Sequence, residues 1–156
     1  MQKTILKKPM LNKFYNIESK QLEIGIDEAG RGPMFGRVYS AAVILPKKDD
    51  FKYELLKDSK KFSSKKKILE VANYIKENSI AWAVGYEDEN CIDYKNIKNA
   101  THLAMHKAIN IIVNSNSATT NLCNQYYLLV DGNNFKPYTY LNSKSSMIEQ
   151  INHILI

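Results

Sequence analysis

The chain has 156 residues, of which 44% are hydrophobic and 24% are charged. This length suffices for one globular domain with a core and is too short to expect two. We therefore treat residues 1–156 as one domain that carries an N-terminal extension at residues 1–20. No run approaches the roughly 20 consecutive apolar residues of a membrane span, and the lysine-bearing N-terminus lacks the apolar stretch of a signal peptide. We expect a cytoplasmic protein without a membrane partner.

The chain is basic, with a formal net charge of +6 and an isoelectric point near 9.2, which suggests a polyanionic partner such as nucleic acid. Only Arg31 and Arg37 among its 22 cationic residues are arginines, and both lie in one glycine-rich segment. A guanidinium suits bidentate hydrogen bonding to phosphate, although Arg37 is explained more simply as the cap of a strand. Cys91 and Cys123 lie far apart in the sequence and are interpreted as packing residues.

The first half of the chain predicts three strands and one helix. Short apolar runs indicate strands at residues 22–27 and 38–45. Apolar residues at helical spacing behind Ser63 and Ser64 then predict a helix over residues 63–78. A third strand is predicted at residues 80–86, and the polar run at 87–90 is interpreted as a solvated turn.

The second half predicts a longer helix followed by a return to the sheet. One apolar stripe indicates a helix over residues 94–114, which the polar stretch at 115–124 ends. A fourth strand is predicted at 126–130, and residues 151–156 form either a fifth strand or a helical segment. This order of elements indicates an α/β fold with a mixed sheet and helices packed on it.

Acidic residues stand at the ends of two predicted strands. Asp27 and Glu28 end the first strand, and Asp131 ends the fourth. If these strands are neighbours, the three carboxylates converge at one edge of the sheet, where oxygen ligands suit Mg²⁺ or Mn²⁺. Adjacent residues on a regular strand point to opposite faces, so we expect the strand to break at Asp27 and Glu28. Such acids followed by a turn are also common without any metal.

A glycine-rich loop beside the acids strengthens the interpretation as a metal site. Gly30 and Gly32 flank Arg31, so backbone N–H groups could approach a ligand while the guanidinium meets a phosphate. A phosphodiester laid across the acids would be held there. Dinucleotide binding fits worse, because the segment lacks GxGxxG spacing and opens a strand, and no GK[ST] follows as in a P-loop.

Four segments in order resemble the ribonuclease HII family, the type 2 ribonucleases H. They are GIDEAGRGPMFGRVYSAAVILP (25–46), LKDSKKFS (56–63), NIKNATHLAMHKAI (96–109) and YLLVDGNNFKPY (127–138). The resemblance covers about residues 22–138. It implies a ribonuclease H-like mixed β-sheet with flanking helices.

The resemblance also implies an activity and its residues. Asp27, Glu28 and Asp131 would bind the divalent metal, Mg²⁺ or Mn²⁺, and the Gly30-Arg31-Gly32 loop would recognise the 2′-hydroxyl of a ribonucleotide. The enzyme would be an endonuclease that hydrolyses the RNA strand of RNA–DNA hybrids and cuts 5′ of ribonucleotides embedded in duplex DNA, as in DNA replication and repair. The residues that would contact backbone phosphates are Ser59, Lys60, Asn99 and Thr101.

The chain departs from the family pattern near its C-terminus. Family members continue with a Lys-Gly-Asp segment that supplies a fourth acid, and then with an alanine-rich helix. No aspartate follows Asp131 here, and Glu149 precedes the last predicted strand. We therefore expect a truncated or split member, incomplete at the C-terminus, with an uncovered sheet face, poor stability and low activity. The alternatives are a non-catalytic hybrid-binding module and a subunit completed by a separate C-terminal chain.

Overall fold

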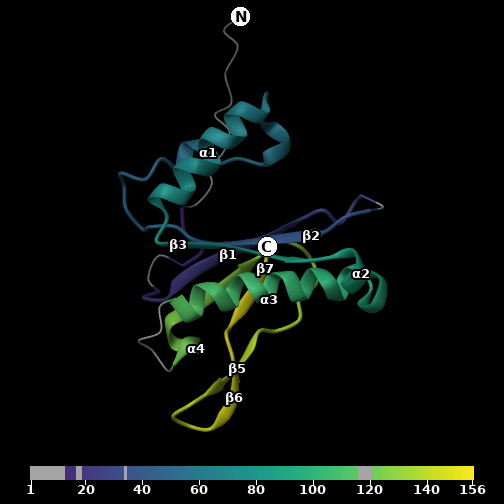
Figure 1. The fold of residues 1–156 in the computed structure, drawn as a ribbon. Coiled ribbons are helices and arrows are strands. Elements are labelled where there is room, and N and C mark those ends of the chain that lie inside the picture. Colours follow the sequence, from purple (N-terminus) through teal and green to yellow (C-terminus); the bar gives the residue numbers. More distant parts are fainter. Residues whose placement is uncertain (1–12, 17–18, 34, 116–120) are drawn as a thin grey trace, which may run out of the picture.

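A five-stranded mixed sheet organises the chain. The computed structural model describes residues 13–16, 19–33, 35–115 and 121–156. The sheet has the order β3-β2-β1-β4-β7, in which β2 is antiparallel to β1 and β3, whereas β1, β4 and β7 are parallel (Figure 1). The predicted α/β fold with a mixed sheet is confirmed. The strands are β1 (Leu22–Ala29), β2 (Val38–Ile44), β3 (Ala81–Glu87), β4 (Tyr126–Val130) and β7 (His153–Leu155).

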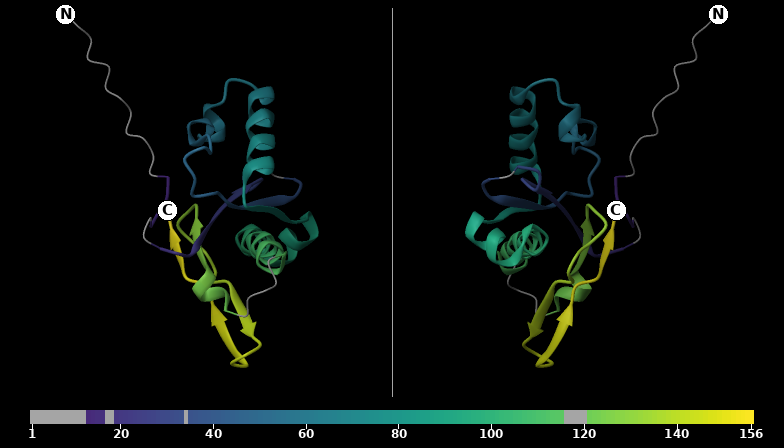
Figure 2. Two further views of the ribbon diagram at one scale, coloured as in Figure 1. Left: turned by 90° about the vertical axis from the view of Figure 1, so that its left-hand side faces the viewer. Right: turned by 90° about the vertical axis from the view of Figure 1, so that its right-hand side faces the viewer.

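Helices lie on both sides of this sheet. The long helix α3 (Ile97–Ser115) packs along one face, and α1 (Lys65–Asn78) stands on the other side, as both views in Figure 2 show. The predicted first helix is confirmed, including its cap, because the Ser64 side chain accepts a hydrogen bond from the backbone N–H of Lys67. The remaining helical segments are α2 (Glu89–Lys95), α4 (Leu122–Gln125) and the 3₁₀ turns Tyr53–Leu55 and Ser59–Lys61.

The core lies between the sheet and α3. Alternate strand residues point to this face because side chains on a strand alternate, and Ile24, Ile26, Leu128 and Val130 are almost fully buried there. The facing side of α3 contributes the apolar residues Met105, Ile109 and Ile112. Burying side chains of this size stabilises the fold by about 1.5–3 kcal/mol each. The interface between the sheet and α3 is therefore a main source of stability.

The opposite face of the sheet exposes apolar side chains. On β3, Trp82, Val84 and Tyr86 are between 44% and 46% exposed, and Tyr39 on β2 lies beside Tyr86. Cations cover part of this surface, since the Arg37 guanidinium lies 4.7 Å from the centre of the Tyr86 ring. The expected exposed apolar surface is present on this face, and its covering by a further C-terminal helix stays a prediction. Arg37 precedes β2 and packs on an aromatic ring there.

The second predicted helix is wrong in its boundaries. The structure has two helices in place of one over residues 94–114, because Asn96 adopts a left-handed conformation with φ of 66° that no helix continues through. The polar run at 87–90 is not a solvated turn either. Glu87 ends β3 as a buried residue paired with Lys107 at 2.9 Å, and the Asp88 side chain caps α2. Short polar side chains begin a helix as readily as a turn.

The C-terminal part adds a hairpin that the sequence pattern did not predict. Strands β5 (Thr139–Asn142) and β6 (Met147–Gln150) pair with each other and project from the main sheet (Figure 1). Residues 151–156 contain a strand, β7, parallel to β4, so the strand interpretation of this segment is confirmed. Of the polar stretch at 115–124, residues 116–120 lie outside the described part of the chain.

Both cysteines are free, and they differ in their surroundings. Cys91 packs against the small apolar cluster of Val38, Ala100 and Ala104, as predicted for a packing residue. The Cys123 thiol lies 2.9 Å from the Asn121 side-chain oxygen, in a polar setting. Within the described ranges, no helix has the length and apolar character needed to cross a membrane.

The contact between β3 and α3 depends on Gly85. A Cβ at this position would lie 2.8 Å from the backbone nitrogen of Ala108 and still closer to the Ala104 carbonyl oxygen. We expect Gly85→Ala to lower the free energy of unfolding by about 3 kcal/mol, because the backbone of α3 would have to move. Urea unfolding measures the change.

Gly25→Ala is the matched control, since a Cβ on this glycine of β1 would meet only ordinary contacts, the nearest at 3.8 Å from Val43. Equal stability of the Gly85→Ala and Gly25→Ala variants would contradict the close packing of β3 on α3.

Candidate active site

Parallel pairing of β1 with β4 brings the predicted acids together. Ile26 lies opposite Val130 in this pairing, and the Asp131 backbone N–H donates to the Ile26 carbonyl at 2.9 Å. The next residue on each strand is an aspartate, so Asp27 and Asp131 are neighbours. The condition set by the sequence, that the first and fourth strands are neighbours, is met.

The strand does not break at the acid pair, contrary to the prediction. β1 continues through Ala29, with Asp27, Glu28 and Ala29 paired to residues of β2. Asp27 and Glu28 therefore point to opposite faces. Glu28 points toward α3 and lines a cavity of about 310 Å³. Asp131 also lines this cavity, here called the acid cavity, whereas Asp27 does not. The pairing of β1 with β2 keeps the strand regular at the acid pair. The Ser40 hydroxyl adds to this pairing by donating to the Asp27 carbonyl at 2.8 Å.

The three acids influence one another electrostatically. Partial burial raises the pKa of Asp27 above its usual range, and the negative charges of Asp131 and Glu28 raise it further. The backbone N–H of Glu28 opposes this shift by donating to Asp27 Oδ1 at 2.6 Å. Crowded carboxylates of this kind are relieved by a cation, and oxygen-only ligands favour a hard divalent ion.

The glycine-rich loop brings its arginine back to the acids. Gly30 has a φ of 95°, and a Cβ there would lie 2.6 Å from the Arg37 carbonyl oxygen, so only glycine fits. This turn lets Arg31 Nη1 approach Glu28 Oε1 at 2.9 Å. Gly32 has open space around it. The loop thus leaves an exposed guanidinium and accessible backbone beside the acids.

Several residues of this cavity were not predicted from the sequence. Lys98 and His102 on α3 line it together with Asn133 and Asn134, which follow Asp131. Burial lowers the pKa of His102, and nearby cations lower it further, although its Nε2 contact with the Asn134 carbonyl at 3.3 Å opposes the shift. Helical spacing could have revealed the α3 residues, because Lys98 and His102 are four positions apart, on the face that carries Thr101.

The predicted phosphate contacts are distributed over three places. Thr101 lines the acid cavity, but it is buried and its hydroxyl donates to the Ile97 carbonyl at 2.7 Å. Asn99 lines a neighbouring cavity, and its side chain donates to the Lys95 carbonyl. Ser59 and Lys60 are exposed on the 3₁₀ turn that precedes α1 and line neither of these two cavities.

The three carboxylates are ligands of the kind that a divalent cation prefers, but they do not converge on one point in this structure. Among the described residues, no three histidine, cysteine or acidic side chains stand together as a ready metal site. Glu28 is paired with Arg31 and points to the face opposite Asp27. A cation shared by all three acids therefore requires Glu28 to leave that pairing and the end of β1 to turn. Glu149 takes no part, because its carboxylate accepts hydrogen bonds from Tyr140 and Asn142 in the hairpin.

Solved structures with the same fold are ribonucleases H. An RNase HII from Archaeoglobus fulgidus, solved as a complex with PCNA, has a TM-score of 0.57 at 19% identity and covers 86% of this chain and 62% of its own. Bst-RNase HIII in complex with Mn²⁺ has a TM-score of 0.56 at 20% identity, covering 82% of this chain and 40% of its own. The chain therefore has the ribonuclease H fold, with acids at the junction of its central strands.

Sequence comparison identifies the family. The family model of ribonuclease HII matches residues 24–150. The chain is 43% identical over 122 residues to the ribonuclease HII of Bacteroides fragilis, covering 78% of this chain and 55% of the relative. It is 47% identical over 115 residues to that of Chlorobaculum parvum, covering 72% of this chain and 51% of the relative. The chain belongs to the ribonuclease HII family and spans about half the length of these relatives.

The raised pKa of Asp27 predicts the effect of removing its charge. An acid whose pKa is higher in the folded state than in the unfolded state destabilises the fold once it ionises, so this cost is present at neutral pH and disappears in acid. We expect Asp27→Asn to raise the free energy of unfolding at pH 7 without added metal. The gain should be less than about 1 kcal/mol, because solvent still reaches much of the partly buried Asp27.

Denaturant unfolding at pH 7 and pH 3 measures this difference, which should vanish at pH 3. The Asn side chain can keep the hydrogen bond from Glu28 N–H, so a loss of stability at pH 7 would contradict the repulsion between the acids.

Proposed function

We propose that this chain carries the cleavage site of an endoribonuclease that hydrolyses the RNA strand of RNA–DNA hybrids and cuts 5′ of ribonucleotides embedded in DNA. The observation that carries the proposal is the meeting of Asp27 and Asp131 across paired strands, beside Glu28 and the Gly30-Arg31-Gly32 loop. Membership of the ribonuclease HII family supports the same activity.

Asp27, Glu28 and Asp131 would hold the divalent metal, Mg²⁺ or Mn²⁺. When bound, the metal supplies a positive charge that activates water and neutralises the phosphodiester. The mutual repulsion that raises the pKa of Asp27 supports this role, because bound positive charge would relieve it. Arg31 would exchange its pairing with Glu28 for the backbone phosphate of the substrate, which frees the Glu28 carboxylate for the cation.

The loop would distinguish RNA from DNA. The backbone at Gly32 is accessible, since a Cβ added there would meet no neighbour within 4 Å, whereas Gly30 forms the tight turn. A ribose 2′-hydroxyl can both donate to and accept from such backbone groups. Ser59, Lys60 and Asn99 would contact the backbone outside the acid cavity. Thr101 could donate to a phosphate only by releasing its bond to the Ile97 carbonyl.

A nicking assay on a DNA duplex with a single ribonucleotide, run with Mg²⁺ and with Mn²⁺, tests the proposal. We expect metal-dependent cutting on the 5′ side of the ribonucleotide. Asp27→Asn, Glu28→Gln and Asp131→Asn should each lower the rate on the order of 10²-fold or more, because each removes a metal ligand. Lys144→Ala, at the exposed turn of the hairpin, is the control that should cut like the parent.

Acid variants that cut as fast as the parent would overturn the metal assignment. Tight hybrid binding that ignores metal, with no cutting by the parent chain, would favour a hybrid-binding module instead. Recovery of cutting only after addition of a separate chain would favour a subunit of a split enzyme.

A further inference from the structure

A second cavity adjoins the acid cavity along α3. It has a volume of about 480 Å³, and His102 lines both cavities. On α3 it is bordered by Asn99, His102, Leu103 and His106, residues spaced three and four positions apart that form one stripe of the helix. Tyr94 and Lys95, at the end of α2, and Lys136, in the loop after β4, complete the wall.

Two histidines fix this wall in place. His106 Nε2 lies 2.7 Å from the Lys136 carbonyl and His102 Nε2 lies 3.3 Å from the Asn134 carbonyl. A carbonyl oxygen only accepts, so the proton of each imidazole is on Nε2. Between these contacts the Phe135 ring packs edge-on against both imidazoles. The loop is thereby held on α3, so that Lys136 lines the cavity.

The charged side chains of this cavity are all cations, whereas the acid cavity has Glu28 and Asp131 beside Arg31 and Lys98. Burial lowers the pKa of both His102 and His106, so the imidazoles are neutral at pH 7 and the positive charge comes from Lys95 and Lys136. No acidic side chain of the described residues lines it. Such a site attracts an anion, and its place beside the acids is where a bound nucleic acid would continue.

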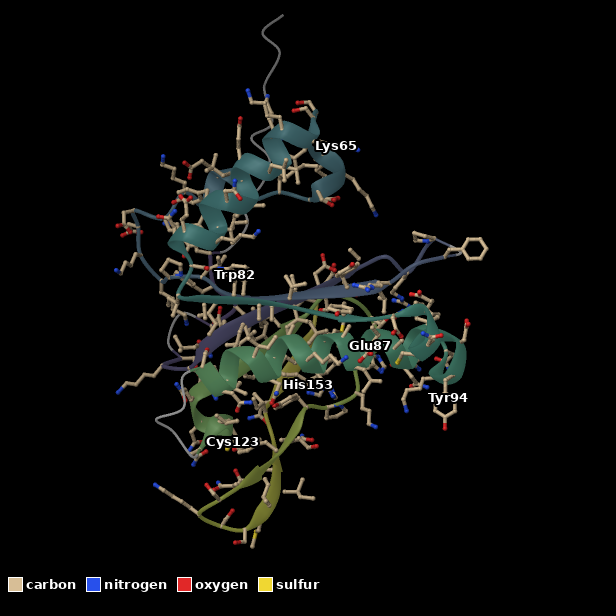
Figure 3. The ribbon with its side chains drawn as sticks, viewed as in Figure 1. Lys65, Trp82, Glu87, Tyr94, Cys123 and His153 are labelled. Atoms are coloured by element: carbon tan, nitrogen blue, oxygen red, sulfur yellow. The ribbon has the colours of Figure 1, made fainter. Side chains whose placement is uncertain are left out.

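An exposed aromatic ring stands at its edge. Tyr94 is 85% exposed, and Figure 3 shows it at the outer side of α2, directed away from the sheet. The left-handed Asn96 separates α2 from α3 and holds the junction, because its side chain accepts from the Asn99 backbone N–H at 3.0 Å. A tyrosine so placed offers a flat surface for a sugar or base.

We propose that this second cavity binds a backbone phosphate of the nucleic-acid substrate away from the scissile position, with Lys95 and Lys136 as its cationic contacts and Tyr94 packing against the adjoining nucleoside. The proposal rests on the proposed function, since the acid cavity defines where the substrate enters. The break at Asn96 places residues of both α2 and α3 on this binding surface.

Binding of the full chain to a DNA duplex with one ribonucleotide, measured by fluorescence anisotropy without divalent metal, tests this site. Lys95→Ala and Lys136→Ala should each weaken binding about fivefold and make the salt dependence shallower by about 0.9 in log K against log salt. Tyr94→Ala should weaken binding with an unchanged salt slope, and Tyr94→Phe should bind like the parent. Lys144→Ala removes the same charge at the hairpin turn and should change neither quantity.

A scan with uncharged methylphosphonates locates the contact. At a single phosphate distant from the ribonucleotide, the methylphosphonate should weaken duplex binding by the parent. The same replacement should leave binding by the Lys95→Ala/Lys136→Ala double variant unchanged. Parent binding with no effect of either lysine beyond that of Lys144→Ala would overturn this site and leave the proposed function standing. No binding of the duplex by the parent, with or without Mg²⁺, would overturn both.

Discussion

The pairing of β1 with β4 is the constraint on which the rest of the structure depends. Ile26 and Val130 are opposite each other in a parallel pair of strands. The carboxylates of Asp27 and Asp131, which follow them, therefore lie close together. The core under α3 fixes this register, since a slip of one residue would turn Ile24 and Ile26 out of the apolar interior. The folding energy thus holds together like charges that would separate in a free chain.

Two sets of cationic residues lie near these acids, one in the acid cavity and one in the second cavity. Arg31 meets Glu28 directly through the turn at Gly30, and Lys98 stands across the same cavity. Farther along α3 the lysines of the second cavity continue the cationic surface. This arrangement suits a polyanion whose reacting phosphate approaches the acids while a neighbouring phosphate lies at the second cavity.

The sequence predicted the sheet and the acids well, because strand ends and ordered motifs are local signals. These signals placed Asp27 and Asp131 at strand ends, and the pairing of β1 with β4 then brings them together. The strand break at Asp27 was wrong because pairing with β2 cannot be seen in a local pattern. The break at Asn96 was missed since a left-handed residue inside an apolar stripe leaves no mark on the periodicity. The second cavity depends on a loop folding back onto α3, which only tertiary structure reveals.

The central claim is that Asp27, Glu28 and Asp131 share one divalent cation. Paramagnetic broadening of backbone amide signals by Mn²⁺ tests it most directly, because the effect falls steeply with distance from the ion. We predict that low concentrations of Mn²⁺ broaden the signals of Asp27, Glu28, Asp131 and Gly132 first, and that Mg²⁺ restores them by competition. Broadening centred elsewhere, or equal broadening in the Asp131→Asn variant, would contradict the account.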